Sequence, residues 1–194
     1  MTVSTAAAPV TRRLPGVEGV WVFVLADMCF FGLLFVSFMQ ERIKQGALFE
    51  TARLTLNPDF GGINTLILLT SSWFVVLAVD AAKHDRLGEI PKLLLAALLM
   101  GFAFGVSKAI EYGGKLAAGI TPMSNDFYMF YFSLTGIHLL HVIGGCAMLA
   151  LFWNKARNGE FGSERMKVLE SGATYWHMVD LLWIFLFPLL YLLR

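Results

Sequence analysis

The chain has 194 residues, of which 57% are hydrophobic and 15% are charged, and its formal net charge at pH 7 is +1. This composition, with a positive mean hydropathy, excludes an ordinary soluble domain, and the sequence has no basic face of the kind that binds nucleic acid. A helix crosses the ~30 Å hydrocarbon core of a bilayer with about 20 mostly apolar residues. Five stretches have this length and character: residues 17–41, 61–82, 91–115, 126–153 and 171–193.

These stretches predict an all-α integral membrane protein, a bundle of five transmembrane helices that forms one domain over residues 17–194. The connections between them are too short to bury a core of their own. Residues 1–16 contain two arginines but no apolar run before a cleavage site, so we expect a disordered tail and not a signal peptide. Lysine and arginine are more frequent in this tail and in the second and fourth loops than in the other loops. By the positive-inside rule, this distribution predicts a cytoplasmic N-terminus.

The first stretch carries one carboxyl at membrane depth, Asp27, in the segment WVFVLADMCFFGLLF. No partner for Asp27 is evident within its own helix. Burial without a partner disfavours the charged form of a carboxyl, which makes Asp27 a candidate for proton exchange. The alternative is a protonated carboxyl that hydrogen-bonds to a neighbouring helix, and the residues leave both interpretations open.

The third stretch has a small residue at every fourth position. These residues are Ala97, Gly101, Gly105 and Ala109. Small residues allow the backbones of two helices to approach closely, so this face is predicted to be a packing seam. Lys108 lies in the same stripe, and Glu111 follows it at the spacing of an ion pair on one helix face. We expect an ion pair, or a bond to an adjacent helix, and a structural role for both side chains.

The fourth and fifth stretches each place polar side chains along one helix face. The fourth contributes Tyr131, Thr135, His138, His141 and Gly145, and the fifth contributes Glu170, Thr174, His177 and Asp180. The two faces are predicted to lie opposite each other. Histidine and carboxylate ligands from neighbouring helices are typical of metal sites in bundles, but hydrogen bonds among neutral side chains would satisfy the same groups. The spacing leaves both alternatives open.

Two tryptophans of the fifth stretch flank a carboxyl. Trp176 and Trp183 lie two turns apart, and Asp180 lies between them near the same face. A hydrogen bond from an indole N–H group to the Asp180 carboxylate is therefore one predicted arrangement.

Five sequence blocks, one in each stretch, resemble subunit III of the heme-copper oxidases. They are WVFVLADMCFF, INTLILLTSSWFVVLA, GFAFGVSKAIEY, FSLTGIHLLHVIGG and LESGATYWHMVDLLWIFLF. The last two are the most specific, through the patterns Thr-Gly-x-His-x-x-His-Val and Tyr-Trp-His-x-Val-Asp-x-x-Trp. The resemblance implies the five-helix form of the subunit. The opening LPGVEGVWVFVLADM is most similar to the branch associated with nitric oxide reductase gene clusters.

The resemblance implies an accessory subunit of the bacterial inner membrane, without chemistry or a metal of its own. Heme and copper would lie in partner subunits, and the catalytic partner would be that of a heme-copper oxidase or a nitric oxide reductase. The chain would bind phospholipid and support proton uptake. Asp27 matches the carboxyl that is implicated in proton-related effects in the family and that hydrophobic carbodiimides modify. The candidates for structural or lipid-cleft roles are Lys108, Glu111, His138, His141, Glu170, Trp176, His177 and Asp180.

Some positions depart from the family pattern. Asp27 stands where a Glu is common, and Lys108 stands where a Gln is common before the Glu-Tyr pair. Two alternative functions follow from the residues alone. The first is an independent membrane enzyme with a metal at His138, His141, His177 and Asp180. The second is a small proton-coupled carrier built around Asp27 and the Lys108–Glu111 pair.

Overall fold

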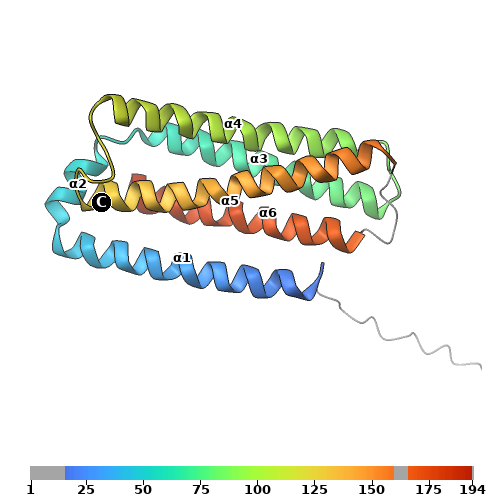
Figure 1. Ribbon diagram of the computed structural model, residues 1–194, viewed down its shortest axis with the longest axis horizontal. Helices are drawn as coiled ribbons and strands as arrows, with labels where there is room; N and C mark the ends of the chain where they lie inside the picture. The colour runs from blue at the N-terminus through green and yellow to red at the C-terminus, as the bar shows by residue number, and fades with distance from the viewer. Residues whose placement is uncertain (1–15, 160–165, 194) are drawn as a thin grey trace, which may run out of the picture.

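The computed structural model describes residues 16–159 and 166–193, so the predicted tail lies outside the described residues except for Gly16. The described residues form α1 (Glu18–Lys44), α2 (Gly46–Arg53), α3 (Pro58–Lys83), α4 (Ile90–Ala117), α5 (Asp126–Arg157), α6 (Met166–Phe187) and the π-helix η2 (Pro188–Leu192). Figure 1 shows the long helices side by side along one axis, with α1 at one edge of the bundle and α4 at the other.

Five helices in the described part of the chain are long and apolar enough to cross a membrane: α1, α3, α4, α5 and the continuous segment of α6 and η2. The prediction of an all-α, multi-pass membrane fold is therefore confirmed. Most helix ends extend beyond the predicted stretches, because polar residues continue the helices past the apolar core. For example, α5 runs on to Arg157, and α6 begins at Met166 rather than at residue 171.

Two of the membrane helices begin at an asparagine cap. The Asn57 side chain accepts a hydrogen bond from the Asp59 backbone N–H (2.9 Å), and Pro58 occupies the first position of α3. The Asn125 side chain accepts from the Tyr128 N–H (3.0 Å) at the start of α5. Such caps satisfy backbone donors that have no partner within the helix. They set where these two helices start.

The sequence predicts a connection over residues 42–60, and the structure places the helix α2 inside it. The prediction was wrong here because one short helix of two turns gives little periodic signal. The helix is nevertheless anchored, since Phe49, Ala52 and Arg53 are buried. Arg53 Nη1 donates to the Tyr191 carbonyl of η2 (3.1 Å), and Arg53 also pairs with Glu50. This bond to Glu50 raises the pKa of the Arg53 guanidinium.

The predicted packing seam of α4 is only half right. Ala97 and Gly101 are buried, but Ala109 is exposed, and a Cβ atom added to Gly105 would meet nothing within 4 Å. Each four-residue step turns a side chain about 40° further round an α-helix, so the stripe leaves the contact face. The observed buried face alternates steps of four and three residues. It consists of Ile90, Leu94, Ala97, Gly101, Phe104 and Lys108.

The core lies among α3, α4, α5 and α6, and α1 flanks it. Of the α1 residues, only Phe31 and Phe38 are buried. The Trp176 ring, 1% exposed, fills the centre of the core next to two glycines. A Cβ atom at Gly145 would lie 2.5 Å from this ring, and one at Gly101 would lie 2.8 Å from it. Glycine at these positions allows α4 and α5 to close on the indole.

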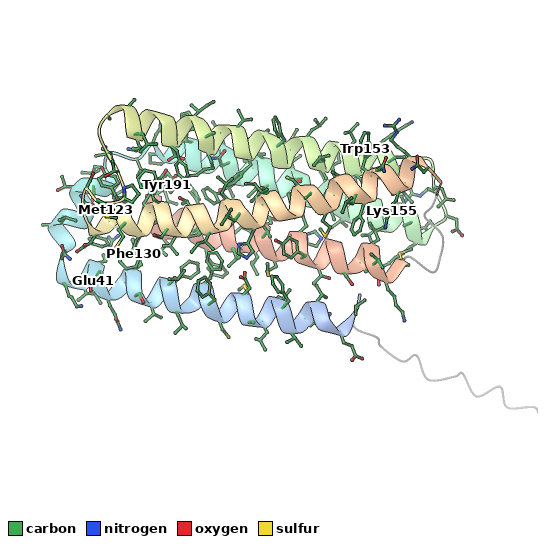
Figure 2. All side chains as sticks on the ribbon, viewed as in Figure 1. Glu41, Met123, Phe130, Trp153, Lys155 and Tyr191 are labelled. Carbon is green, nitrogen blue, oxygen red and sulfur yellow. The ribbon has the colours of Figure 1, made fainter. Side chains whose placement is uncertain are left out.

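The two ends of the bundle are marked in Figure 2. Trp153 and Lys155 lie at one end, with Glu41 and Met123 at the other. The first end also receives the C-terminus of α3 and the N-terminus of α4 (Figure 1). The second end carries α2 and η2.

Candidate functional site

The carboxyl of Asp27 has its partner on another helix. Asp27 Oδ1 lies 3.0 Å from His141 Nε2, and the two side chains are 11% and 18% exposed. The structure therefore shows the contact between the Asp27 carboxyl and a neighbouring helix that one of the two interpretations of the sequence expected. The Asp27 Oδ2 atom is buried and has no hydrogen-bond partner among the described residues.

The second ring nitrogen of His141 fixes how many protons this pair holds. His141 Nδ1 lies 2.8 Å from the Ile137 carbonyl, which only accepts, so Nδ1 carries a hydrogen. Nε2 then either accepts from a protonated Asp27 or donates to an ionised one. Both arrangements hold one shared proton between carboxyl and Nε2, and both leave the pair without net charge. A pair without net charge has a lower free-energy cost at membrane depth than a single charged side chain would have.

Aromatic side chains enclose this pair. The Phe31 ring lies edge-on to the His141 ring, with 5.7 Å between centroids. The Tyr175 hydroxyl donates to the His141 carbonyl (3.0 Å), and the Phe23 ring lies 5.9 Å from that of Tyr175. The site therefore joins α1, α5 and α6.

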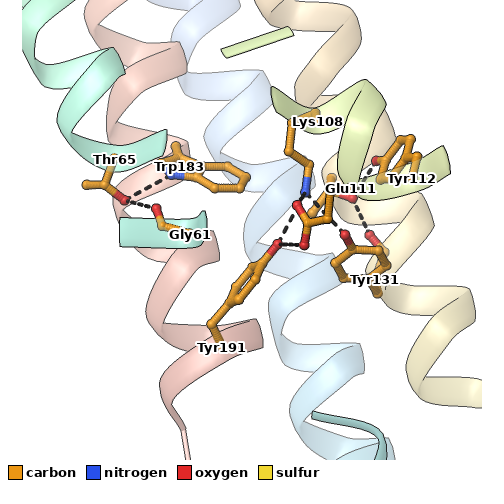
Figure 3. Close-up of polar contacts among 9 residues, drawn as sticks. Gly61, Thr65, Lys108, Glu111, Tyr112, Tyr131, Trp183 and Tyr191 are labelled. Atoms are coloured by element: carbon orange, nitrogen blue, oxygen red, sulfur yellow. Dashed lines mark hydrogen bonds and ion pairs between the residues drawn. The ribbon is translucent and has the colours of Figure 1, made fainter. Parts of the chain in front are cut away.

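Lys108 lies in the core and is fully buried. Its Nζ atom lies 2.7 Å from Glu111 Oε2, and it donates to the Tyr131 and Tyr191 hydroxyls at 3.3 and 3.2 Å (Figure 3). These three acceptors match the three N–H groups of an ammonium. The ion pair expected from the spacing is present, and it extends to two other helical segments.

Aromatic rings and a cavity complete this cluster. The Lys108 Nζ atom lies 5.0–5.9 Å from the ring centroids of four residues: Tyr112, Tyr131, Trp183 and Tyr191. The Tyr191 hydroxyl also donates to Glu111 Oε1 (2.6 Å). Glu111 lines a cavity of about 430 Å³ that Lys115 and Thr55 also line. The carboxylate therefore borders open space, and the ammonium does not.

The histidines and Asp180 do not form one site. His138 Nε2 donates to the Val179 carbonyl (3.0 Å), whereas His177 Nδ1 lies 3.0 Å from Ser72 Oγ on α3. His141 turns to α1 instead, because a spacing of three residues separates two side chains by about 60° round the helix. The prediction that the two polar faces lie opposite each other therefore holds only in part: His138 meets the α6 backbone, but His177 bonds to α3 and His141 bonds to α1. In residues 16–159 and 166–193, no group of three or more His, Cys, Asp or Glu side chains is placed to hold a metal ion.

Three further predicted residues have separate surroundings. Glu170 pairs with Lys83 (3.3 Å) and accepts from the Gly16 backbone N–H (3.3 Å). The predicted bond between an indole and Asp180 is absent from the described residues: Trp176 Nε1 has no partner there, and neither has Asp180 Oδ1. The Trp183 N–H donates to Thr65 Oγ1 instead (3.0 Å, Figure 3).

Sequence reasoning missed several residues that make these contacts. Ser72, Thr65 and Tyr175 bond to predicted site residues or to their neighbours, and Arg53 and Tyr191 link α2 to the Lys108 cluster. A hydroxyl inside an apolar stretch was the available signal, because it must find a bonding partner there. The signal does not say which helix supplies that partner.

A groove of about 300 Å³ lies between α3 and α6. We call it the α3/α6 groove. Its walls are apolar at Val76, Val79 and Ala173, and polar at Asp80, Lys83, Glu170, Thr174 and His177. His177 is its innermost polar residue along α6, about 16 Å from Met166.

Comparison with known proteins identifies the family. The profile of the family described as "Cytochrome c oxidase subunit III" matches residues 7–193. The chain belongs to the cytochrome c oxidase subunit III family. Similar proteins include the probable cytochrome c oxidase subunit 3 of Rickettsia conorii, 33% identical over 90% of this chain and 66% of the relative. The cytochrome c oxidase subunit 3 of Thermostichus vulcanus is 32% identical over 91% of this chain and 87% of the relative.

The extent of the match differs among subunit III relatives. The chain spans about two thirds of the length of the Rickettsia relative. It spans 98% of the probable cytochrome c oxidase subunit 3 of Mycobacterium bovis, with 27% identity over 99% of this chain. Subunit III proteins carry no catalytic metal centre.

Proposed function

We propose that this chain is the non-catalytic accessory subunit of a respiratory heme-copper oxidase complex. The observation that carries the proposal is the family match over residues 7–193. In this function heme and copper belong to partner subunits, and the catalytic partner is an oxidase or, following the resemblance of the opening segment, a nitric oxide reductase. The chain contributes stability, bound phospholipid and support of proton uptake to that partner.

The proposed location is the bacterial inner membrane with the N-terminus in the cytoplasm. The support is the basic character of one end of the bundle, where Lys83, Arg86, Lys92, Lys155 and Arg157 lie near helix ends. Basic residues favour the cytoplasmic side of a membrane. A periplasmic reporter fused after Arg194 should therefore be active, and an inactive reporter in a stably expressed fusion would contradict this orientation.

The proton-related group is Asp27 in this proposal, acting with His141. The support is the single proton that the two side chains share across α1 and α5. Phospholipid is proposed to lie between α1 and the four-helix core, since most of α1 remains exposed in the isolated chain. Lys108, Glu111, His138, Glu170, Trp176, His177 and Asp180 are proposed to order the bundle through the contacts described above.

One purification tests the function. The tagged chain is isolated in mild detergent from its native membranes, a heme spectrum is recorded, and the co-purified proteins are identified. We expect a heme-bearing catalytic subunit in the preparation, and its identity separates an oxidase from a nitric oxide reductase. A chain that purifies without any heme protein, or with a stoichiometric metal of its own, would refute the accessory function.

A further inference from the structure

The innermost polar residue of the α3/α6 groove, His177, lies close to the middle of the membrane together with its hydrogen-bond partner Ser72. Ser72 and His177 both lie about 16 Å from the same end of the bundle, measured along α3 from Lys83 and along α6 from Met166. That distance is about half of a ~30 Å hydrocarbon core. The ring of His177 is only half-buried. A polar side chain at this depth, on the outside of a bundle, requires a partner.

The bonding of His177 shows what kind of partner is required. Nδ1 is taken by Ser72 Oγ (3.0 Å), so Nε2 is the ring nitrogen left for the occupant of the groove. Thr174, which lines the groove one turn away, donates its hydroxyl to the Glu170 carbonyl of its own helix (2.9 Å), so the group that still requires a partner is the His177 ring. Hydrocarbon tails offer neither donor nor acceptor to Nε2, whereas a polar side chain on a neighbouring membrane helix offers both. The ring nitrogen therefore favours a protein helix over lipid at this level.

Exposed apolar side chains continue the groove on both helices. On α3 these are Trp73 and Val76, 62% and 49% exposed. On α6, Leu181 and Ile184 lie on the same helix face as His177 and are 41% and 39% exposed. We call Trp73, Val76, His177, Leu181 and Ile184 together the α3/α6 surface. Trp73 lies mid-helix, away from the membrane interface where tryptophan is commonest, and large aromatic side chains are enriched in protein interfaces.

The outward face of α4 differs at the same depth. It presents Leu99, Phe102, Val106 and Ile110, all of which are exposed and apolar. Phe102 is 68% exposed and lies about as far from its end of the bundle as Trp73 does. Such a face suits contact with lipid tails. The α3/α6 surface combines the same apolar exposure with groups that form hydrogen bonds.

We propose that the α3/α6 surface docks this chain onto a transmembrane helix of its catalytic partner, with a polar group of that helix bonded to His177 Nε2. The inference rests on the proposed function, because that function supplies the partner. It adds which face of the bundle meets the partner and which side chain anchors the contact.

Site-specific photocrosslinking in the intact complex tests the docking face. In native membranes p-benzoylphenylalanine replaces Trp73 or Leu181 on the proposed face, and Phe102 on α4 as the matched control. After illumination, we expect Trp73 and Leu181 probes to yield a product with the heme-bearing subunit, several-fold above the Phe102 probe. Products from Phe102 alone, equal products from all three positions, or attachment to lipid alone would overturn the proposal.

A second measurement tests the anchor. His177→Leu removes the polar ring at similar size, and Thr70→Val is the control, because the Thr70 hydroxyl bonds the Leu66 carbonyl of its own helix (2.7 Å). With the amount of chain in the membrane held equal, His177→Leu should lower the co-purified heme subunit several-fold, and Thr70→Val should not. Equal recovery with both variants would overturn the role of His177. If His177→Leu fails to accumulate, the crosslinks at Trp73 and Leu181 in the otherwise unchanged chain decide.

The two proposals fail in different ways. If the unmodified tagged chain recovers no heme protein, the proposed function fails. If it recovers the heme protein while the crosslinks arise from another face, only the docking inference fails.

Discussion

Removing either member of the Lys108–Glu111 pair should destabilise the bundle, and the two losses should differ. Glu111→Gln leaves a fully buried ammonium without a counter-charge. Breaking a buried pair in this way costs about 3–5 kcal/mol. Lys108→Met instead leaves the carboxylate of Glu111, which keeps the Tyr191 hydroxyl at 2.6 Å and borders the 430 Å³ cavity. Because water can reach this carboxylate, Lys108→Met should lower the free energy of unfolding by less than Glu111→Gln does, by about 1–3 kcal/mol.

The double variant separates charge from packing. Lys108→Met with Glu111→Gln removes both charges, and replacing a buried ion pair by neutral groups is often close to neutral. We therefore expect the double variant to be more stable than Glu111→Gln alone. Lys115→Met is the control on the same helix, since the Lys115 ammonium lies near the outside and donates to the Thr55 carbonyl (2.6 Å). Its effect should stay within about 0.5 kcal/mol, as for most surface changes.

The assay is unfolding of the purified chain by SDS in mixed micelles, followed by helical circular dichroism. The two single variants, the double variant and the unmodified chain give the free-energy differences of a double-mutant cycle, and Lys115→Met is measured beside them as the control. A larger loss in Lys108→Met than in Glu111→Gln would refute the argument from burial. A double variant that loses the sum of the two single losses would show that the two charges do not stabilise each other.

Three other predictions concern packing, proton binding and the complex. In the same unfolding assay, Gly145→Ala should lower the free energy of unfolding by about 1–3 kcal/mol through overpacking, since its Cβ would lie 2.5 Å from the Trp176 ring. Gly105→Ala, which has open space around it, should leave the free energy of unfolding unchanged or raise it. A hydrophobic carbodiimide should label Asp27, and the label should vanish in Asp27→Asn and increase in His141→Leu, because a carboxyl without its histidine partner favours the protonated form that the reagent attacks. Peptide mapping that finds the label on Glu111 instead would contradict this prediction. A complex depleted of this chain should keep its heme spectrum and initial turnover and lose activity faster during turnover, measured as rate against time; immediate loss of heme or of all activity would mean that the chain carries chemistry.

The helices could be predicted from the sequence because the membrane makes a strong demand on each one separately. A stretch such as residues 61–82 must be apolar along its length, whatever it packs against. The start of α5 at Asp126 could also be predicted, since the Asn125 cap acts locally. These features depend on neighbours in the chain.

The contacts between helices could not be predicted in the same way. His138 and His141 share a polar stripe in the sequence, yet one reaches α6 and the other α1. The partner of Asp27 depends on how α1 sits against α5, which no pattern within either helix specifies. The same holds for Trp183, which bonds Thr65 on α3 rather than the carboxyl on its own helix.

The contact between Asp27 and His141 also imposes an order on biogenesis. The two residues are 114 positions apart, so at typical synthesis rates Asp27 is added to the chain roughly 6–23 s before His141. During this interval, α1 enters the bilayer with a lone carboxyl. Its hydrogen-bond partner arrives only with α5. Closure of α1 onto the bundle is thus a late event of assembly, which follows insertion of α5.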